Sequence, residues 1–225
     1  MSDASKRSSA LLDAQDALLL LRSRSLSLGL IRRIAATPEF VRNDRVRAAI
    51  VLHPRTPRVL AMGLLPHLRW HDLLRVTTTP GCAAPLILGA ERPLALRVPD
   101  LALGDRISLA RAASETLVKT VRRETSPLVV KALLENPRFR SEDALFIAER
   151  PETPAATLRL LAESPRWRGR SDLRHAIAVH PATPPQAALR LVAAMDGPEI
   201  GRLLQSGRAP ALVRLAAERR LSGRG

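Results

Sequence analysis

Apolar residues recur at helical spacing along most of the chain, in short runs that proline-containing phrases separate. Leu117, Val118 and Val121, for example, follow the candidate cap Ser114 at intervals that place them on one face of a helix. No stretch alternates apolar and polar residues with the period of two that a half-buried strand requires. The pattern therefore predicts an all-α protein built from short helices.

The separating phrase occurs twice in almost the same form, as His53-Pro54-Arg55-Thr56-Pro57 and as His180-Pro181-Ala182-Thr183-Pro184, with a looser copy at residues 150–154. Its first proline cannot continue the preceding helix, because it has no N–H and its ring clashes with the turn before it. We expect the threonine to cap the next helix and the second proline to take its first position. Each phrase thus predicts the end of one helix and the start of another.

A longer repetition surrounds these phrases. Residues 31–94 match residues 158–221 at a constant offset of 127 without a gap, so that Phe40 matches Trp167 and Arg47 matches Arg174. A shorter relation of 28–30 residues links the sequences around Pro137 and Pro165 and the Thr-Pro pairs at 153–154 and 183–184. We predict a tail at residues 1–9 and one α-solenoid domain over 10–222, made of two-helix modules of 28–30 residues with an internal duplication.

Local signals place some of the helices. We expect a first helix over residues 10–22, a turn-rich connector over 97–105, and a last helix over about 210–221. Ser141 and Ser171 are predicted helix starts, because acids follow them where the helix dipole favours negative charge.

Two passages carry a family resemblance. Residues 176–184 read Ala-Ile-Ala-Val-His-Pro-Ala-Thr-Pro, and residues 157–163 read Thr-Leu-Arg-Leu-Leu-Ala-Glu. This pattern resembles the leucine-rich-repeat-variant and HEAT-like α-solenoids, over most of residues 31–221. The resemblance implies a right-handed superhelix with a concave and a convex face, and it implies no particular activity. Some variant-repeat proteins hold an iron–sulfur centre with several cysteines, whereas Cys82 stands alone here, so we expect no cofactor.

Charge narrows the choice of partner. The chain has 225 residues, 36 Lys and Arg against 21 Asp and Glu, and a net charge of +15, which favours a polyanion or an acidic protein. One cysteine excludes an internal disulfide and favours a reducing compartment. The first residues lack the apolar run of a secretion signal, and residues 17–21 are too short an apolar run to span a bilayer. We expect a cytoplasmic protein with no membrane partner and no small-molecule substrate.

Arginines follow a Pro-x-aromatic triplet in three modules, at Pro38, Pro137 and Pro165. Equivalent loops of a solenoid stack on one edge, so these arginines would form a basic ridge able to follow phosphates without reading bases. The predicted polyanion-binding residues are Arg42, Arg45, Arg47, Arg138, Arg140, Arg166, Arg168, Arg170 and Arg174.

Other candidate chemistry is weaker. We expect the aromatic rings of the triplets to fill the core, and His53 and His180 to cap carbonyl groups at helix ends. His67 and His71 have zinc-like spacing but no third ligand, so no metal site is predicted. No nucleophile with a base and no phosphate loop is visible, so no catalytic residue is predicted.

Three functions stay open at this point. The leading one is a non-enzymatic scaffold whose basic edge binds nucleic acid or a ribonucleoprotein. The alternative is a protein–protein adaptor that receives an acidic peptide or partner in a concave groove. The remote alternative is a HEAT-like DNA glycosylase that uses Trp70 with Asp72, or Trp167 with Asp172.

Overall fold

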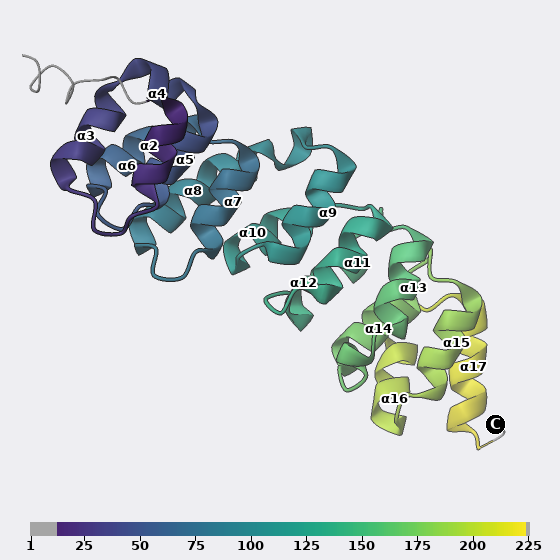
Figure 1. Ribbon diagram of the computed structural model, residues 1–225. Coiled ribbons are helices and arrows are strands. Elements are labelled where there is room, and N and C mark those ends of the chain that lie inside the picture. The colour runs from purple at the N-terminus through teal and green to yellow at the C-terminus, as the bar shows by residue number, and fades with distance from the viewer. Residues whose placement is uncertain (1–12, 224–225) are drawn as a thin grey trace, which may run out of the picture. The chain divides into compact units, whose positions relative to one another are not determined.

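The computed structural model describes residues 13–223, which are helical throughout and contain no strand (Figure 1). The all-α prediction is confirmed. Within these residues the chain forms sixteen α-helices and three short 3-10 helices. They fall into two compact units, one that ends at Pro99 and one that begins at Asp100, and each unit is described by itself. The predicted tail at residues 1–9 lies outside the described residues.

The described part of the first unit, residues 13–99, contains seven α-helices. In this unit α5 packs against α2, α3, α6 and α7, and α8 packs against α6 and α7. The buried side chains that join them are mostly Ile, Leu, Val and Ala, in keeping with a chain that has few aromatic residues. The helices are α2 (Ala14–Leu21), α3 (Leu28–Ala36), α4 (Pro38–Arg42), α5 (Asp44–Leu52), α6 (Arg58–Leu64), α7 (Trp70–Thr78) and α8 (Ala84–Arg97), with η1 (Leu65–His67) after α6.

The second unit arranges its helices in two rows. One row contains α9, α11, α13, α15 and α17, each packed against the next, and the other contains α12, α14 and α16. Contacts of α14 with α13 and α15 join the rows. The helices are α9 (Leu103–Ala112), α10 (Glu115–Val121), α11 (Pro127–Glu135), α12 (Ser141–Ala148), α13 (Ala155–Glu163), α14 (Ser171–Val179), α15 (Pro185–Ala193), α16 (Gly197–Gln205) and α17 (Ala211–Leu221), with η2 (Val98–Asp100) before α9 and η3 (Pro165–Trp167) after α13.

The two units repeat each other helix by helix. Every helix from α2 to α8 begins 127 residues before a helix of the second unit: α12, α13, η3, α14, α15, α16 and α17. The pair α2 and α12 lies one helix before the matched block at residues 31–94. Its sequence signal is Asp16-Ala17-Leu18, which recurs as Asp143-Ala144-Leu145.

Several predicted boundaries are correct and one segment is not. Helices begin at Ser141 and Ser171, and Ser114 accepts a hydrogen bond from the Leu117 N–H as a helix cap. The connector predicted over residues 97–105 is largely helical, because α8 runs to Arg97, η2 follows it and α9 begins at Leu103. Pro99 lies inside η2 and Gly104 inside the first turn of α9, so neither residue leaves the segment as a long turn.

Candidate functional site

The repeated phrase builds the same turn at each of its occurrences. The threonine hydroxyl donates back to a carbonyl of the preceding helix, at 2.6 Å, from Thr56 to Ile50 and from Thr183 to Ile177. Thr153 makes the same 2.6 Å bond to Ile147. The prediction that these threonines cap the next helix is wrong. The proline that follows occupies the cap position, without a side-chain hydrogen bond, and not the first helical position.

His53 and His180 join neighbouring helices through both ring nitrogens. Nε2 of His180 donates to the Arg150 carbonyl at 2.9 Å, and Nδ1 accepts from the Ala182 N–H at 3.1 Å. His53 makes the equivalent bonds, 3.0 Å to the Ser23 carbonyl and 3.1 Å from the Arg55 N–H. The partners fix the Nε2–H tautomer, because one is an acceptor and the other a donor. The expectation that these histidines serve helix ends is confirmed.

Asn136 makes the corresponding connection with an amide. Its Nδ2 donates to the carbonyls of Ala110 and Ala113 at 2.8 and 3.0 Å, and its Oδ1 accepts from the Arg138 N–H at 2.8 Å. Asn136 follows α11 and reaches back to the end of α9, just as His180 follows α14 and reaches back past α12. The residue after a helix therefore satisfies exposed carbonyls at the end of the helix before it in the same row.

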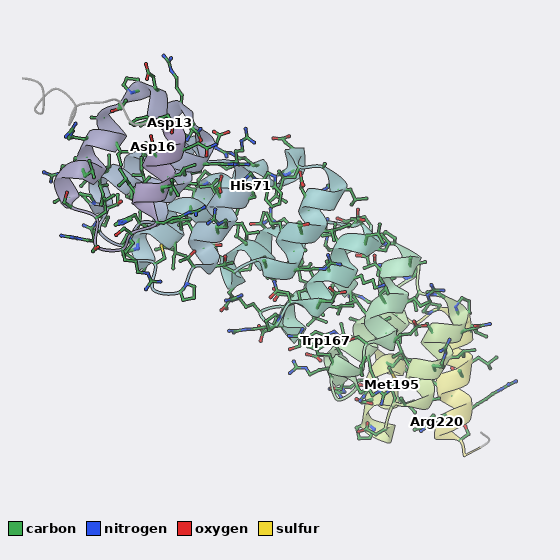
Figure 2. All side chains as sticks on the ribbon, in the orientation of Figure 1. Asp13, Asp16, His71, Trp167, Met195 and Arg220 are labelled. Atoms are coloured by element: carbon green, nitrogen blue, oxygen red, sulfur yellow. The ribbon has the colours of Figure 1, made fainter. Side chains whose placement is uncertain are left out.

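Arginine side chains also donate hydrogen bonds to main-chain carbonyls of neighbouring segments. Arg166 donates to the carbonyls of Asn136 at 2.9 Å and Pro137 at 3.2 Å, and also to that of Phe139. Arg150 donates to the Arg123 carbonyl at 2.6 Å, and Arg220 reaches the Met195 carbonyl at 3.3 Å (Figure 2). The C-terminal ends of helices carry partial negative charge, so a guanidinium is favourable there. Part of the positive charge that suggested a polyanion partner is thus used inside the fold.

The nine arginines of the predicted ridge divide into two sets. Arg166 binds carbonyls, and four others are held by carboxylates: Arg47 by Asp44, Arg140 by Glu115, Arg170 by Asp172 and Arg174 by Glu199. The side chains of the remaining four have no partner within residues 13–223 and are exposed. These four are Arg42, Arg45, Arg138 and Arg168.

The aromatic rings of the triplets are buried, as expected. Phe40, Phe139 and Trp167 are 7%, 0% and 8% exposed, and the rings of Phe139 and Trp167 meet edge to face at 6.1 Å. Trp167 lies at the end of η3, inside the second unit (Figure 2).

The glycosylase pairs are not assembled into a site. Asp172 is held by Arg170 and lines one groove, whereas Trp167 lines a different cavity. Asp72 is buried and bonded to Arg75, and Trp70 packs edge to face against His71. No cluster of three potential metal ligands occurs within residues 13–223. His67 belongs to η1 and His71 to α7, so their spacing does not place them on one helix.

A groove runs along α14 of the second unit, between α12 and α16. Its volume is about 1130 Å³. Leu145, Ala148 and Val179 supply apolar surface, and prolines of the connecting phrases extend it. His175, Arg202 and Arg208 add polar groups on the side of α16. This volume suits a peptide side chain or a short peptide segment.

The side of the groove near α16 is positively charged. Burial lowers the pKa of His175, and the charges of Arg202 and Arg208 lower it further, so the ring is biased toward its neutral form. Neither arginine has a side-chain partner within the described part of the chain, whereas the groove acids Asp172 and Glu199 are already paired. Glu149 adds a carboxylate on the side of α12. The groove therefore offers an anion two free guanidinium groups at one end.

Sequence reasoning missed this groove. Arg202 matches Arg75 at the 127-residue offset, and neither His175 nor Arg208 belongs to a recognisable motif. The usable signal is the 127-residue comparison itself, because His175 and Arg208 stand where the first unit has Ala48 and Gly81.

Comparisons with protein-family models, with curated proteins and with solved structures give no match. The case for function therefore depends on the geometry of the chain itself. None of the helices within residues 13–223 combines the length and apolar character that crossing a membrane requires.

Proposed function

We propose that this protein is a non-enzymatic helical-repeat adaptor, and that the groove along α14 receives an acidic segment of a partner protein. The observation that carries the proposal is the pair Arg202 and Arg208, unpaired at one end of a groove of about 1130 Å³. An acidic side chain placed there would replace water around two guanidinium groups with charge-assisted hydrogen bonds.

The mixed lining favours a peptide over a nucleic-acid backbone. Leu145, Ala148 and Val179 form an apolar region beside the arginines, which suits an apolar side chain next to an acidic one. Glu149 would repel a phosphate chain that continued toward α12. The expected ligand therefore carries acidic residues over α16 and apolar residues over α12.

The same proposal includes the finer architecture. The two rows of the second unit support stacked two-helix modules, and the 127-residue recurrence of helix starts supports a duplicated array. We propose that the array forms a right-handed superhelix with the groove on one of its faces.

A peptide array tests the binding proposal. It combines Asp or Glu with Leu or Val, and matched peptides carry Lys or Arg in place of the acids. We expect only the acidic-apolar set to bind, and Arg202→Gln with Arg208→Gln to weaken binding about tenfold or more. Arg75→Gln is the control, because Arg75 matches Arg202 in the first unit. Equal binding by the double variant and the control would remove the groove from the proposal.

A polyanion is the second candidate, favoured by the four exposed arginines without partners. Arg42, Arg45, Arg138 and Arg168 would each neutralise a phosphate, so nucleic-acid affinity should fall steeply with salt. Replacing all four with Gln should flatten that salt dependence, whereas Arg140→Gln with Arg170→Gln should leave it unchanged, because these two exposed arginines are already paired with Glu115 and Asp172. A salt slope that does not respond to the four substitutions would exclude this candidate.

A further inference from the structure

A second cavity of about 530 Å³ lies between α13, α14 and α15 in the second unit. Leu161, Leu173 and Ile177 contribute to its mostly apolar wall. Its charged groups are Glu163, Arg168, Arg190 and Arg174, and the last of these is paired with Glu199. The cavity shares no lining residue with the groove, because the two use different residues of α14.

Trp167 lines this cavity and has an unsatisfied polar atom. Its indole Nε1 is enclosed, and no acceptor for it exists within residues 13–223. The ring packs against Phe139, and the guanidinium of Arg166 lies 4.8 Å from a ring centroid. A buried N–H without an acceptor destabilises a fold, so such groups are rare unless a ligand or water serves them.

The first unit shows that the fold does not need this N–H. Phe40 stands at the position of Trp167, and the apolar residues Ile34, Val46 and Ile50 stand at those of Leu161, Leu173 and Ile177. The apolar wall therefore recurs while the indole N–H does not.

The two arginines of the cavity that lack a carboxylate partner within residues 13–223, Arg168 and Arg190, also belong to the second unit alone, and the Arg190 Nε donates to the Gln186 carbonyl at 3.4 Å. Val41 stands at the position of Arg168 and Gly63 at that of Arg190. The second copy of an otherwise repeated apolar site thus carries one hydrogen-bond donor and two cations that the first copy lacks.

We propose that the cavity between α13, α14 and α15 binds a small carboxylate with an apolar body. The carboxylate accepts from the indole N–H of Trp167 and is neutralised by Arg168 and Arg190, while the body fills the apolar wall. The volume lies within the usual range for small-ligand sites. This site is independent of the acidic-peptide groove.

Decanoate and decanol are the probes, since they share a chain and differ in charge. Nitrogen-15 spectra of the full chain resolve two indole N–H signals, and Trp70→Phe and Trp167→Phe assign them. We expect decanoate to shift the Trp167 signal saturably and to leave that of Trp70 in place. Calorimetry should show decanol binding about tenfold more weakly, because it lacks the charge that the arginines recognise. Equal affinity for the two probes, or no shift of the Trp167 signal, would overturn the proposal.

Two variants copy the first unit into the second. Trp167→Phe introduces the residue found at Phe40, and we expect it to weaken decanoate binding about tenfold with little change in the unfolding midpoint. Arg168→Val combined with Arg190→Ala should weaken decanoate binding and leave decanol binding unchanged. This double variant changes exposed residues, so it decides the matter even if Trp167→Phe does not fold. Wild-type affinity for decanoate in either folded variant would count against the site.

Discussion

The two units share their turns and differ in the surfaces that the turns hold. His53 and His180, and likewise Thr56 and Thr183, make equivalent hydrogen bonds at lengths that agree within 0.1 Å. The residues that line the groove of the second unit differ from their counterparts in the first: the second unit has His175 where the first has Ala48. The comparison teaches that groups serving helix ends preserve the repeat, while lining residues are free to acquire binding chemistry.

Ion pairs show how a small sequence change redirects a shared arginine. Arg174 pairs with Glu199 at 2.5 Å, and their side chains are 18% and 7% exposed. Arg47, at the matching position, instead pairs with Asp44, where the second unit has Ser171. Asp72 matches Glu199 but is one methylene shorter, and it pairs with Arg75 on its own helix. A local acid and a shorter side chain are enough to replace a bond between helices with bonds within them.

The largest effect is expected at the buried pair of the second unit. Arg174→Met leaves Glu199 buried without its partner and should lower the free energy of unfolding by about 3–5 kcal/mol. Arg47→Met is the control and should cost less, because Asp44 keeps Arg69 and is 29% exposed. Urea unfolding read from Trp167 fluorescence in a Trp70→Phe background measures the second unit, and unfolding read from Trp70 in a Trp167→Phe background measures the first. Equal losses from the two variants would break the distinction between the units.

Histidine replacement should affect both units alike. His180→Ala and His53→Ala each remove a donor to a carbonyl and an acceptor for an N–H, at a cost of about 2 kcal/mol. His180→Asn should recover much of this loss, because Asn136 makes the same pair of connections with an amide. Thermal and urea unfolding give the comparison. A loss confined to one unit would show that the shared geometry does not mean shared energetics.

The threonine bonds should give a smaller, uniform effect. Thr56→Val, Thr153→Val and Thr183→Val each delete one 2.6 Å hydrogen bond to a helix carbonyl, and each should cost about 1 kcal/mol. Hydrogen exchange should therefore rise at the ends of the preceding helices, near residues 50, 147 and 177. It should not rise in the helix that follows, where only the loss of a cap would leave an N–H without an acceptor. Faster exchange only in the following helix would restore the capping interpretation.

The smallest expected effect is a pH dependence of the stability of the second unit. The pKa of His175 is lowered, so between its folded value and the ordinary 6.5 the unfolded chain binds the proton and the folded chain does not. Stability should therefore fall as pH decreases through this window, and His175→Gln should reduce the fall. The first unit should not show this pH dependence, because it has Ala48, which does not titrate, at the position of His175. An acidic peptide bound near Arg202 and Arg208 should raise the pKa of His175, which an NMR titration measures.

Sequence reasoning predicted the scaffold better than the sites. Proline positions and apolar spacing predicted the helices, because backbone restrictions and periodicity act locally. The 127-residue match predicted that the helices would recur in the second half of the chain. Whether Arg166 meets a phosphate or the Asn136 carbonyl depends on which loop lies opposite, and spacing along the chain does not contain that information. Thr56 was misassigned for the same reason, since its hydroxyl can turn toward either of two helices. Arg202 and Arg208 stand out as a binding site only when the structure shows that no carboxylate of residues 13–223 pairs with their side chains.

The doubly used carbonyl of Arg150 has a consequence for growth of the array. It accepts from the Thr153 N–H at 3.0 Å within its own turn and from His180 thirty residues later. His180 begins an equivalent turn, and its own carbonyl accepts from the Thr183 N–H at 3.0 Å. A tandem copy of residues 151–180, inserted after His180, would bring a new imidazole to that carbonyl and present a fresh oxygen at its far end. Lengthening the protein by whole modules therefore leaves the count of hydrogen-bond donors and acceptors balanced. Duplication of a module within the gene would then leave no unpaired polar group at this junction.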